Sequence, residues 1–94
     1  MQPIKVTTIR VTPPFKLVVT FSDASFGIFD AAAIIGERGE GTEQLRDRRY
    51  FGTVELKNGV PTWPNHFDLS PAWLREEMEK RGELQLPLPV RRRR

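Results

Sequence analysis

His66 and Asp68 are the pair of side chains in this sequence that comes nearest to a catalytic arrangement. An imidazole oriented by a carboxylate is a general base, and residues two apart on an extended segment point to the same side, so contact between them is feasible. However, the sequence has no serine or cysteine in a recognisable nucleophile elbow and no glycine-rich phosphate loop. We therefore expect a protein that is not an enzyme.

The composition argues against metal and disulfide chemistry as well. The 94 residues include one histidine and no cysteine, which excludes a His-rich or Cys-based zinc site and a disulfide framework. We expect no metal and no cofactor, and the absence of cysteine fits a reducing cytosol. No apolar run reaches the roughly 20 residues that span a bilayer, and the N-terminus lacks a signal-peptide pattern. A cytoplasmic protein without membrane association is the expectation.

The segment 62–74 gathers both tryptophans, two of the eight prolines and the single histidine. At its start, Trp63, Asn65 and His66 are candidate partner-binding residues, because large, rigid and partly polar side chains suit interfaces. In the alternative interpretation, Trp63 fills the core and Asn65 forms a turn through its side chain.

Seven arginines in two groups are candidate contacts for phosphates or for an acidic partner: Arg46, Arg48 and Arg49, and then Arg91, Arg92, Arg93 and Arg94. Residues 1–90 carry 11 basic and 12 acidic side chains, a net charge of −1, so the basicity of the chain lies in its tail. That tail has three interpretations: a non-specific anchor for nucleic acid, a guide for an acidic protein, or a disordered end. For the first group, a solvated salt-bridge surface with Glu43 and Asp47 is the alternative.

The elements that must position these residues begin with strands. Residues 4–11, 15–21 and 26–29 are rich in β-branched and aromatic side chains, and strict alternation in 15–21 indicates one buried face. We predict that they form an N-terminal three-stranded antiparallel meander. A second hairpin turns at Asn58-Gly59, a dipeptide that tolerates the positive φ angles of a type I′ turn.

Short helices follow the meander, and a longer helix comes later in the sequence. Asp30 caps a helix that Gly36 ends, and a second short helix starts at Thr42 and reaches about Tyr50. Ser70 and Pro71 open a C-terminal helix from Pro71 to about Arg81, because serine is a favoured N-cap and proline suits the first helical position. The fold class is therefore α+β, a small antiparallel sheet with short helices and a C-terminal helix.

We expect one α+β domain over residues 1–82, followed by an extended Leu/Pro arm and a basic tail over residues 83–94. The arm alternates apolar residues from Leu84 to Val90. We predict that it covers the sheet edge left by the second hairpin in its own chain, or pairs with that edge in a second copy or a partner.

The order of features resembles the bacterial domain-of-unknown-function family twenty-four forty-two. The matching residues are 15–21 with the turn after them, Phe29-Asp30, Trp63-Pro64-Asn65 and 68–74, and the resemblance covers roughly residues 4–78. This chain departs from the family at Ala24 and His66, where the family often has glycine.

The resemblance implies a small α+β protein, sometimes followed by a helix-turn-helix and often encoded beside another small protein in toxin–antitoxin-like pairs. This chain ends before a helix-turn-helix could fit, so sequence-specific DNA binding is not expected from it. We therefore expect a binding or regulatory module, antitoxin-like, with a small protein partner. A nucleic-acid accessory protein that binds phosphates non-specifically through its Arg tail is the alternative, and a homodimer is a further expectation.

Overall fold

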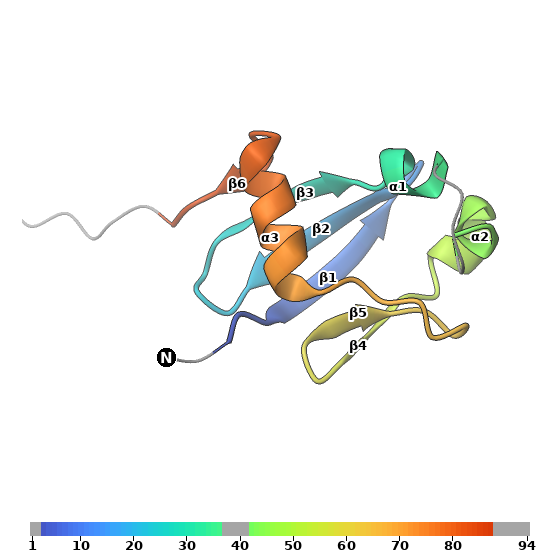
Figure 1. Cartoon of the computed structure of the whole chain (residues 1–94), viewed down its shortest axis with the longest axis horizontal. Helices are drawn as coiled ribbons and strands as arrows, with labels where there is room; N and C mark the ends of the chain where they lie inside the picture. Colours follow the sequence, from blue (N-terminus) through green and yellow to red (C-terminus); the bar gives the residue numbers. More distant parts are fainter. Residues whose placement is uncertain (1–2, 37–41, 88–94) are drawn as a thin grey trace, which may run out of the picture.

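The computed structural model describes residues 3–36 and 42–87 of the chain (Figure 1). Its described elements, in chain order, are β1 (Val6–Thr12), β2 (Lys16–Phe21), β3 (Phe26–Asp30), α1 (Ala32–Gly36), η1 (Gln44–Arg46), α2 (Arg48–Phe51), β4 (Glu55–Lys57), β5 (Val60–Thr62), α3 (Pro71–Lys80) and β6 (Leu84–Gln85). The predicted α+β class is confirmed.

β1, β2, β3 and β6 form a four-stranded antiparallel sheet in that spatial order. Along β2, Leu17, Val19 and Phe21 are buried and point to one face, as their alternation predicts. Phe29 of β3 lies opposite Leu17 and shares that face. The predicted meander is therefore confirmed, and its inner face lies under α3 (Figure 1).

The buried apolar side chains form one cluster: Val6, Leu17, Val19, Phe21, Phe29, Ala31, Ile35, Leu45, Phe51, Trp63, Leu69, Leu74 and Met78. β1, β2, β3, α1, η1, α2 and α3 each contribute to it, as do Trp63 and Leu69 after β5, so the meander and the later elements share one core. In α3, Leu74 and Met78 are four residues apart and therefore face the sheet together.

The second hairpin turns where the sequence predicts. Asn58 and Gly59 have φ angles of 53° and 80°, the left-handed backbone that a type I′ turn requires. The hairpin is held against the meander by a hydrogen bond of 2.9 Å from the Val6 amide to the Gly59 carbonyl. This contact fixes the two-stranded sheet of β4 and β5 beside the start of β1.

The caps of α3 agree with the prediction. The Ser70 hydroxyl accepts a hydrogen bond from the Trp73 amide at 3.3 Å, Pro71 is the first helical residue, and Gly82 follows the helix with a φ of 74°. Near the meander, the Asp30 carboxylate accepts from the Ala32 amide at 3.0 Å, so the expected cap of α1 is present too.

The prediction of one helix from Thr42 to about Tyr50 is wrong. The segment instead contains a 3-10 turn, η1, and a separate helix, α2, with Asp47 between them in an extended conformation (φ −80°, ψ 119°). The Asp47 carboxylate accepts a hydrogen bond from the Arg49 amide at 2.9 Å. Aspartate competes for backbone donors in this way, which favours a new helix start over a continued helix.

Only the beginning of the Leu/Pro arm joins the sheet in the described part of the chain. Leu84 lies opposite Gly27 and Gln85 opposite Phe26, so β6 covers the outer edge of β3 in its own chain. For these two residues the predicted location, the edge left by the second hairpin, is wrong. Residues 88–94, which include Arg91, Arg92, Arg93 and Arg94, lie outside the described residues.

Candidate partner-binding face

Trp63 is a core residue that also carries a structural hydrogen bond. Its side chain is 1% exposed, and its indole N–H donates to the Phe51 carbonyl at 2.9 Å. Its ring lies 5.7 Å from the rings of Phe51 and Phe67. The indole therefore fixes the chain after β5 to the end of α2.

Asn65 makes the turn that follows. Its side-chain oxygen accepts a hydrogen bond from the Phe67 amide at 3.1 Å, and its side-chain N–H₂ donates to the Gln44 side chain of η1. The first of these bonds is the side-chain turn expected from the residue type. The second ties residues 63–67 to the segment that carries Arg46.

His66 is exposed at the tip of this turn. Its amide donates to the Trp63 carbonyl at 2.9 Å, and its φ of 72° is left-handed. Asp68 is also exposed, and within the described residues no hydrogen bond or ion pair joins it to the imidazole. The contact between His66 and Asp68 that a general base would need is therefore not formed.

Arg46, Arg48 and Arg49 are exposed on η1 and α2. The Arg46 guanidinium donates to the Ile35 carbonyl at 3.3 Å, which orients it across the end of α1. Nearby, Asp47 is engaged in capping α2. Among the residues that the structure describes, none of the three arginines forms an ion pair, so their charges are available at the surface.

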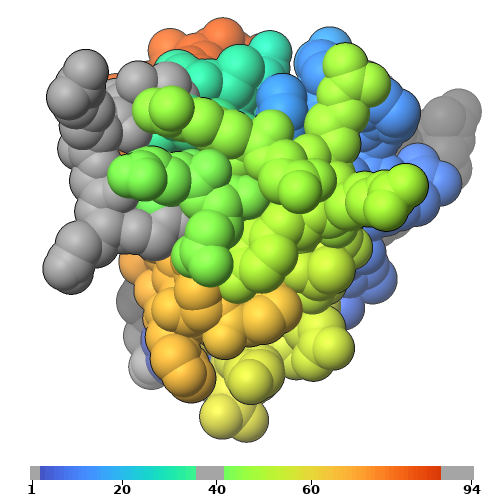
Figure 2. All heavy atoms as spheres, turned by 90° about the vertical axis from the view of Figure 1, so that its right-hand side faces the viewer, coloured from blue at the N-terminus to red at the C-terminus, as the bar shows by residue number. Residues whose placement is uncertain are grey.

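These two predicted groups meet at one end of the molecule, through the contact between Asn65 and Gln44. Figure 2 shows this end, with η1 and α2 in green above the hairpin in yellow and the chain that follows β5 in light orange. We call the surface formed by Arg46, Arg48, Arg49 and His66 the arginine face. Its polar side chains stand on a base that is buried and hydrogen-bonded.

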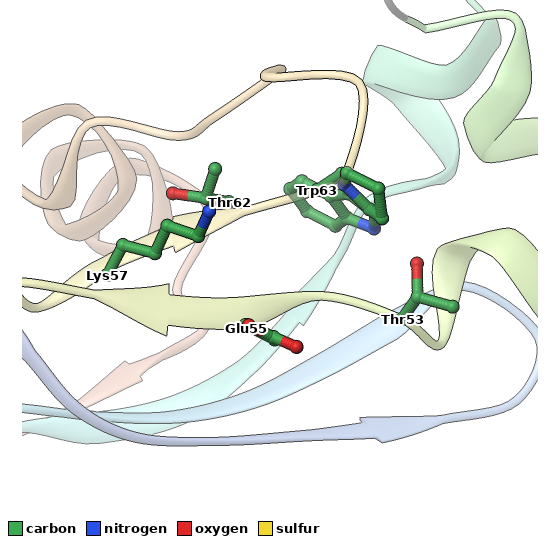
Figure 3. Close-up of a pocket in the computed structure, with 6 residues that line it drawn as sticks. Thr53, Glu55, Lys57, Thr62 and Trp63 are labelled. Carbon is green, nitrogen blue, oxygen red and sulfur yellow. The ribbon is translucent and has the colours of Figure 1, made fainter.

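A small depression opens beside the arginine face, over the hairpin (Figure 3). Its volume is about 180 Å³, and its lining residues are Thr53, Glu55, Lys57, Thr62, Trp63 and Pro64. Ligand pockets for drug-sized molecules are larger, roughly 300–1,000 Å³. The depression therefore suits one inserted side chain of a partner better than a small-molecule substrate.

A polar cluster that the sequence did not reveal lies on the other side of the fold. The Asp23 carboxylate accepts hydrogen bonds from the Ser25 amide and hydroxyl, and it forms an ion pair of 2.9 Å with Arg75 of α3. The Asp23 and Ser25 spacing is typical of a side-chain turn, but the partner 52 residues away has no local signal. This cluster fastens the β2–β3 turn to α3.

The pKa of Asp23 reports the balance of forces in this cluster. Burial alone would raise the pKa, but the hydrogen bonds from Ser25 and the positive charge of Arg75 outweigh burial and hold it below its ordinary value. Since every group in the cluster is bonded to another, we assign it a structural role.

In comparisons with known proteins, no family model matches the chain, and neither a curated protein nor a solved structure is significantly similar to it. Within the described residues, no group of three or more His, Cys, Asp or Glu side chains is placed to hold a metal ion. No helix there is long and apolar enough to cross a membrane.

Proposed function

We propose that the protein is a non-enzymatic binding module, antitoxin-like, that acts in the cytoplasm on a small acidic protein encoded beside it. The observation that carries the proposal is the arginine face, with three exposed guanidinium groups that form no ion pair within the described residues. Arginine is suited to such a role because its planar fork binds carboxylates through two parallel hydrogen bonds.

Rigidity of the supporting backbone adds to this argument. Buried Trp63 and the bond from Asn65 to Gln44 hold η1, α2 and residues 63–67 in one arrangement before a partner arrives. A surface that is already ordered loses little conformational entropy on binding, so more of the contact energy appears as affinity. The adjoining depression offers a place for one partner side chain.

The backbone at two positions supports the proposed relation to the family of unknown function. Ala24 and His66 both have φ angles of 72°, in the left-handed region that favours glycine. The resembling family often has glycine at these two positions. Glycine adopts this backbone without the cost that alanine and histidine incur, which is consistent with the proposed relation.

The decisive experiment is co-expression with the neighbouring gene product, followed by co-purification and titration calorimetry. The variant Arg46→Gln/Arg48→Gln/Arg49→Gln should weaken binding at least about tenfold, since hydrogen bonds to charged groups contribute about 1.5–3 kcal/mol each. The matched control Lys5→Gln/Arg10→Gln/Lys80→Gln removes the same charge elsewhere and should bind like the parent. Equal losses in both variants, or no complex with the parent, would refute the proposal.

Nucleic acid is the second candidate partner, because exposed arginines also bind phosphates. Binding of this kind is independent of base sequence and falls steeply with salt. A fluorescence titration with duplex DNA at several salt concentrations tests it, with a variant that lacks residues 91–94. Salt-sensitive binding that disappears in this variant, together with no protein complex, would favour the nucleic-acid function.

A further inference from the structure

The outer face of the meander, opposite the core, carries apolar side chains that nothing in the described chain covers. The sheet register places Val18 beside Ile28, and Thr20 beside Phe26, on this face. Phe26 is 42% exposed and Ile28 is 50% exposed. Exposed aromatic and β-branched side chains that lie together on one surface indicate an interaction site.

A depression of about 400 Å³ lies on this face, where β3 meets β6. Its lining residues are Val18, Phe26, Gly27, Ile28, Gly82, Glu83 and Gln85. Three of these residues have apolar side chains and two are glycines, so apolar side chains and bare backbone form most of the depression.

Glu83 adds no free charge to the depression. One oxygen of its carboxylate is buried and makes no hydrogen bond with the described residues, but it forms an ion pair of 3.7 Å with the Arg81 guanidinium. A suitable occupant is therefore mainly apolar.

The chain carries a segment of this chemistry after β6. Leu86, Leu88 and Val90 alternate in the sequence, and four arginines follow them. Leu86 is 60% exposed, although it lies only one residue beyond the sheet. The described residues of its own chain do not cover the Leu86 side chain.

The direction of β6 decides which copy of the segment fits. Because Leu84 lies opposite Gly27 and Gln85 opposite Phe26, the chain moves along β3 away from Ile28 as it leaves the sheet. The same chain would have to reverse direction to reach its own depression, and Pro87 and Pro89 favour an extended backbone. A second copy can approach without this reversal.

We propose that the protein forms a symmetric dimer in which residues 86–94 of each copy occupy the Phe26–Ile28 depression of the other. The arrangement is self-complementary, since each copy supplies one segment and one depression, as a two-fold interface requires. The site is independent of the arginine face, so the dimer can exist whether or not the proposed partner binds.

Disulfide trapping tests this exchange directly, because the chain has no cysteine of its own. One copy carries Ile28→Cys, and a second copy with a mass tag carries Leu86→Cys. Mild oxidation of the mixture should give a disulfide-linked pair of tagged and untagged chains. The control pair combines Ile28→Cys with Ala72→Cys in the tagged copy, which places the second thiol on α3. It should give several-fold less of the mixed disulfide.

A single chain that carries both Ile28→Cys and Leu86→Cys shows whether the depression is occupied by the segment of the same chain or by that of a second copy. A disulfide within one chain would mean that each copy fills its own depression, and this result would overturn the dimer. A yield of mixed disulfide no higher than in the control pair would overturn it as well.

Sedimentation of the cysteine-free protein over a dilution series provides an independent readout. Leu86→Asp should raise the dimer dissociation constant at least about tenfold, the change expected when one leucine contact is lost. Ala72→Asp adds the same charge at an exposed position of α3 and should leave the constant unchanged. A parent protein that remains monomeric throughout, or a Leu86→Asp variant that dimerises equally well, would contradict the proposal.

Discussion

Arginines in two regions of this molecule have opposite surroundings. Near α3, the Arg81 guanidinium donates to the Asp30 carbonyl at 2.9 Å, lies 4.8 Å from the centre of the Phe29 ring and pairs with Glu77 at 3.5 Å. On α2, Arg48 and Arg49 make none of these contacts with the described residues. Residue type alone therefore does not distinguish an arginine with a structural role from one whose charge is available to a partner. The neighbouring residues that pack against each guanidinium make this distinction.

The largest expected effect concerns the base of the arginine face. Trp63→Ala should lower the free energy of unfolding by about 3–5 kcal/mol, because it leaves a cavity and removes the partner of the Phe51 carbonyl. Urea denaturation measures this loss. His66→Ala, three residues away and exposed, should change stability by less than about 0.5 kcal/mol. A loss below about 1 kcal/mol for Trp63→Ala would contradict the assigned core role.

The comparison between the two regions is tested by the same substitution in each. Arg81→Ala should cost about 1–3 kcal/mol, since it removes a hydrogen bond, a cation–π contact and an ion pair at once. Arg48→Ala should remain within about 0.5 kcal/mol of the parent. Thermal and urea denaturation of both variants provide the measurement, and equal losses would remove the distinction.

Acid should affect the Asp23 cluster in a definite direction. Since the folded-state pKa of Asp23 lies below its ordinary value of 3.8, its stabilising effect is complete above that pH and is lost as the pH falls through the lower folded-state pKa. Asp23→Asn should therefore be less stable than the parent near pH 7, and the difference should shrink on acidification. Urea midpoints measured from pH 7 to pH 2 would show this, and a difference that stays constant would count against the assignment.

The smallest effect concerns the two left-handed turn residues. Ala24→Gly and His66→Gly should each stabilise the protein by up to about 1 kcal/mol, because glycine avoids the roughly 1–2 kcal/mol cost of this backbone for other residues but gains freedom in the unfolded chain. Ala72→Gly, within α3, should instead cost about 0.5–1 kcal/mol. Melting temperatures that move in the same direction for all three variants would refute the assigned strain.

Local patterns were sufficient where the structure is local. The alternation from Phe15 to Phe21, the Asn58-Gly59 turn and the caps at Ser70 and Gly82 each depend on residues close in sequence, and each is present. The sequence did not indicate the break at Asp47, because an aspartate at this position is compatible both with a continued helix and with the N-cap of a new one.

Contacts between distant residues could not be predicted in the same way. The Asp23 to Arg75 pair joins segments with no common pattern, and the sequence interpretation of Trp63 and Asn65 left an interface and a structural role open. For β6 one signal did exist. Gly27 interrupts an otherwise apolar strand, and glycine there indicates close approach by another backbone, which proved to be Glu83.

The pairing of β3 with β6 also has a consequence for the order in which the protein is made. β3 ends at Asp30 and β6 begins at Leu84, so the strand that covers this edge is the last of the described strands to be synthesised. At about 5–20 residues per second, the intervening segment takes roughly 3–11 s to produce. During that interval a nascent meander exposes an unpaired edge to which other strands can add. The edge closes only after β6 has left the ribosome.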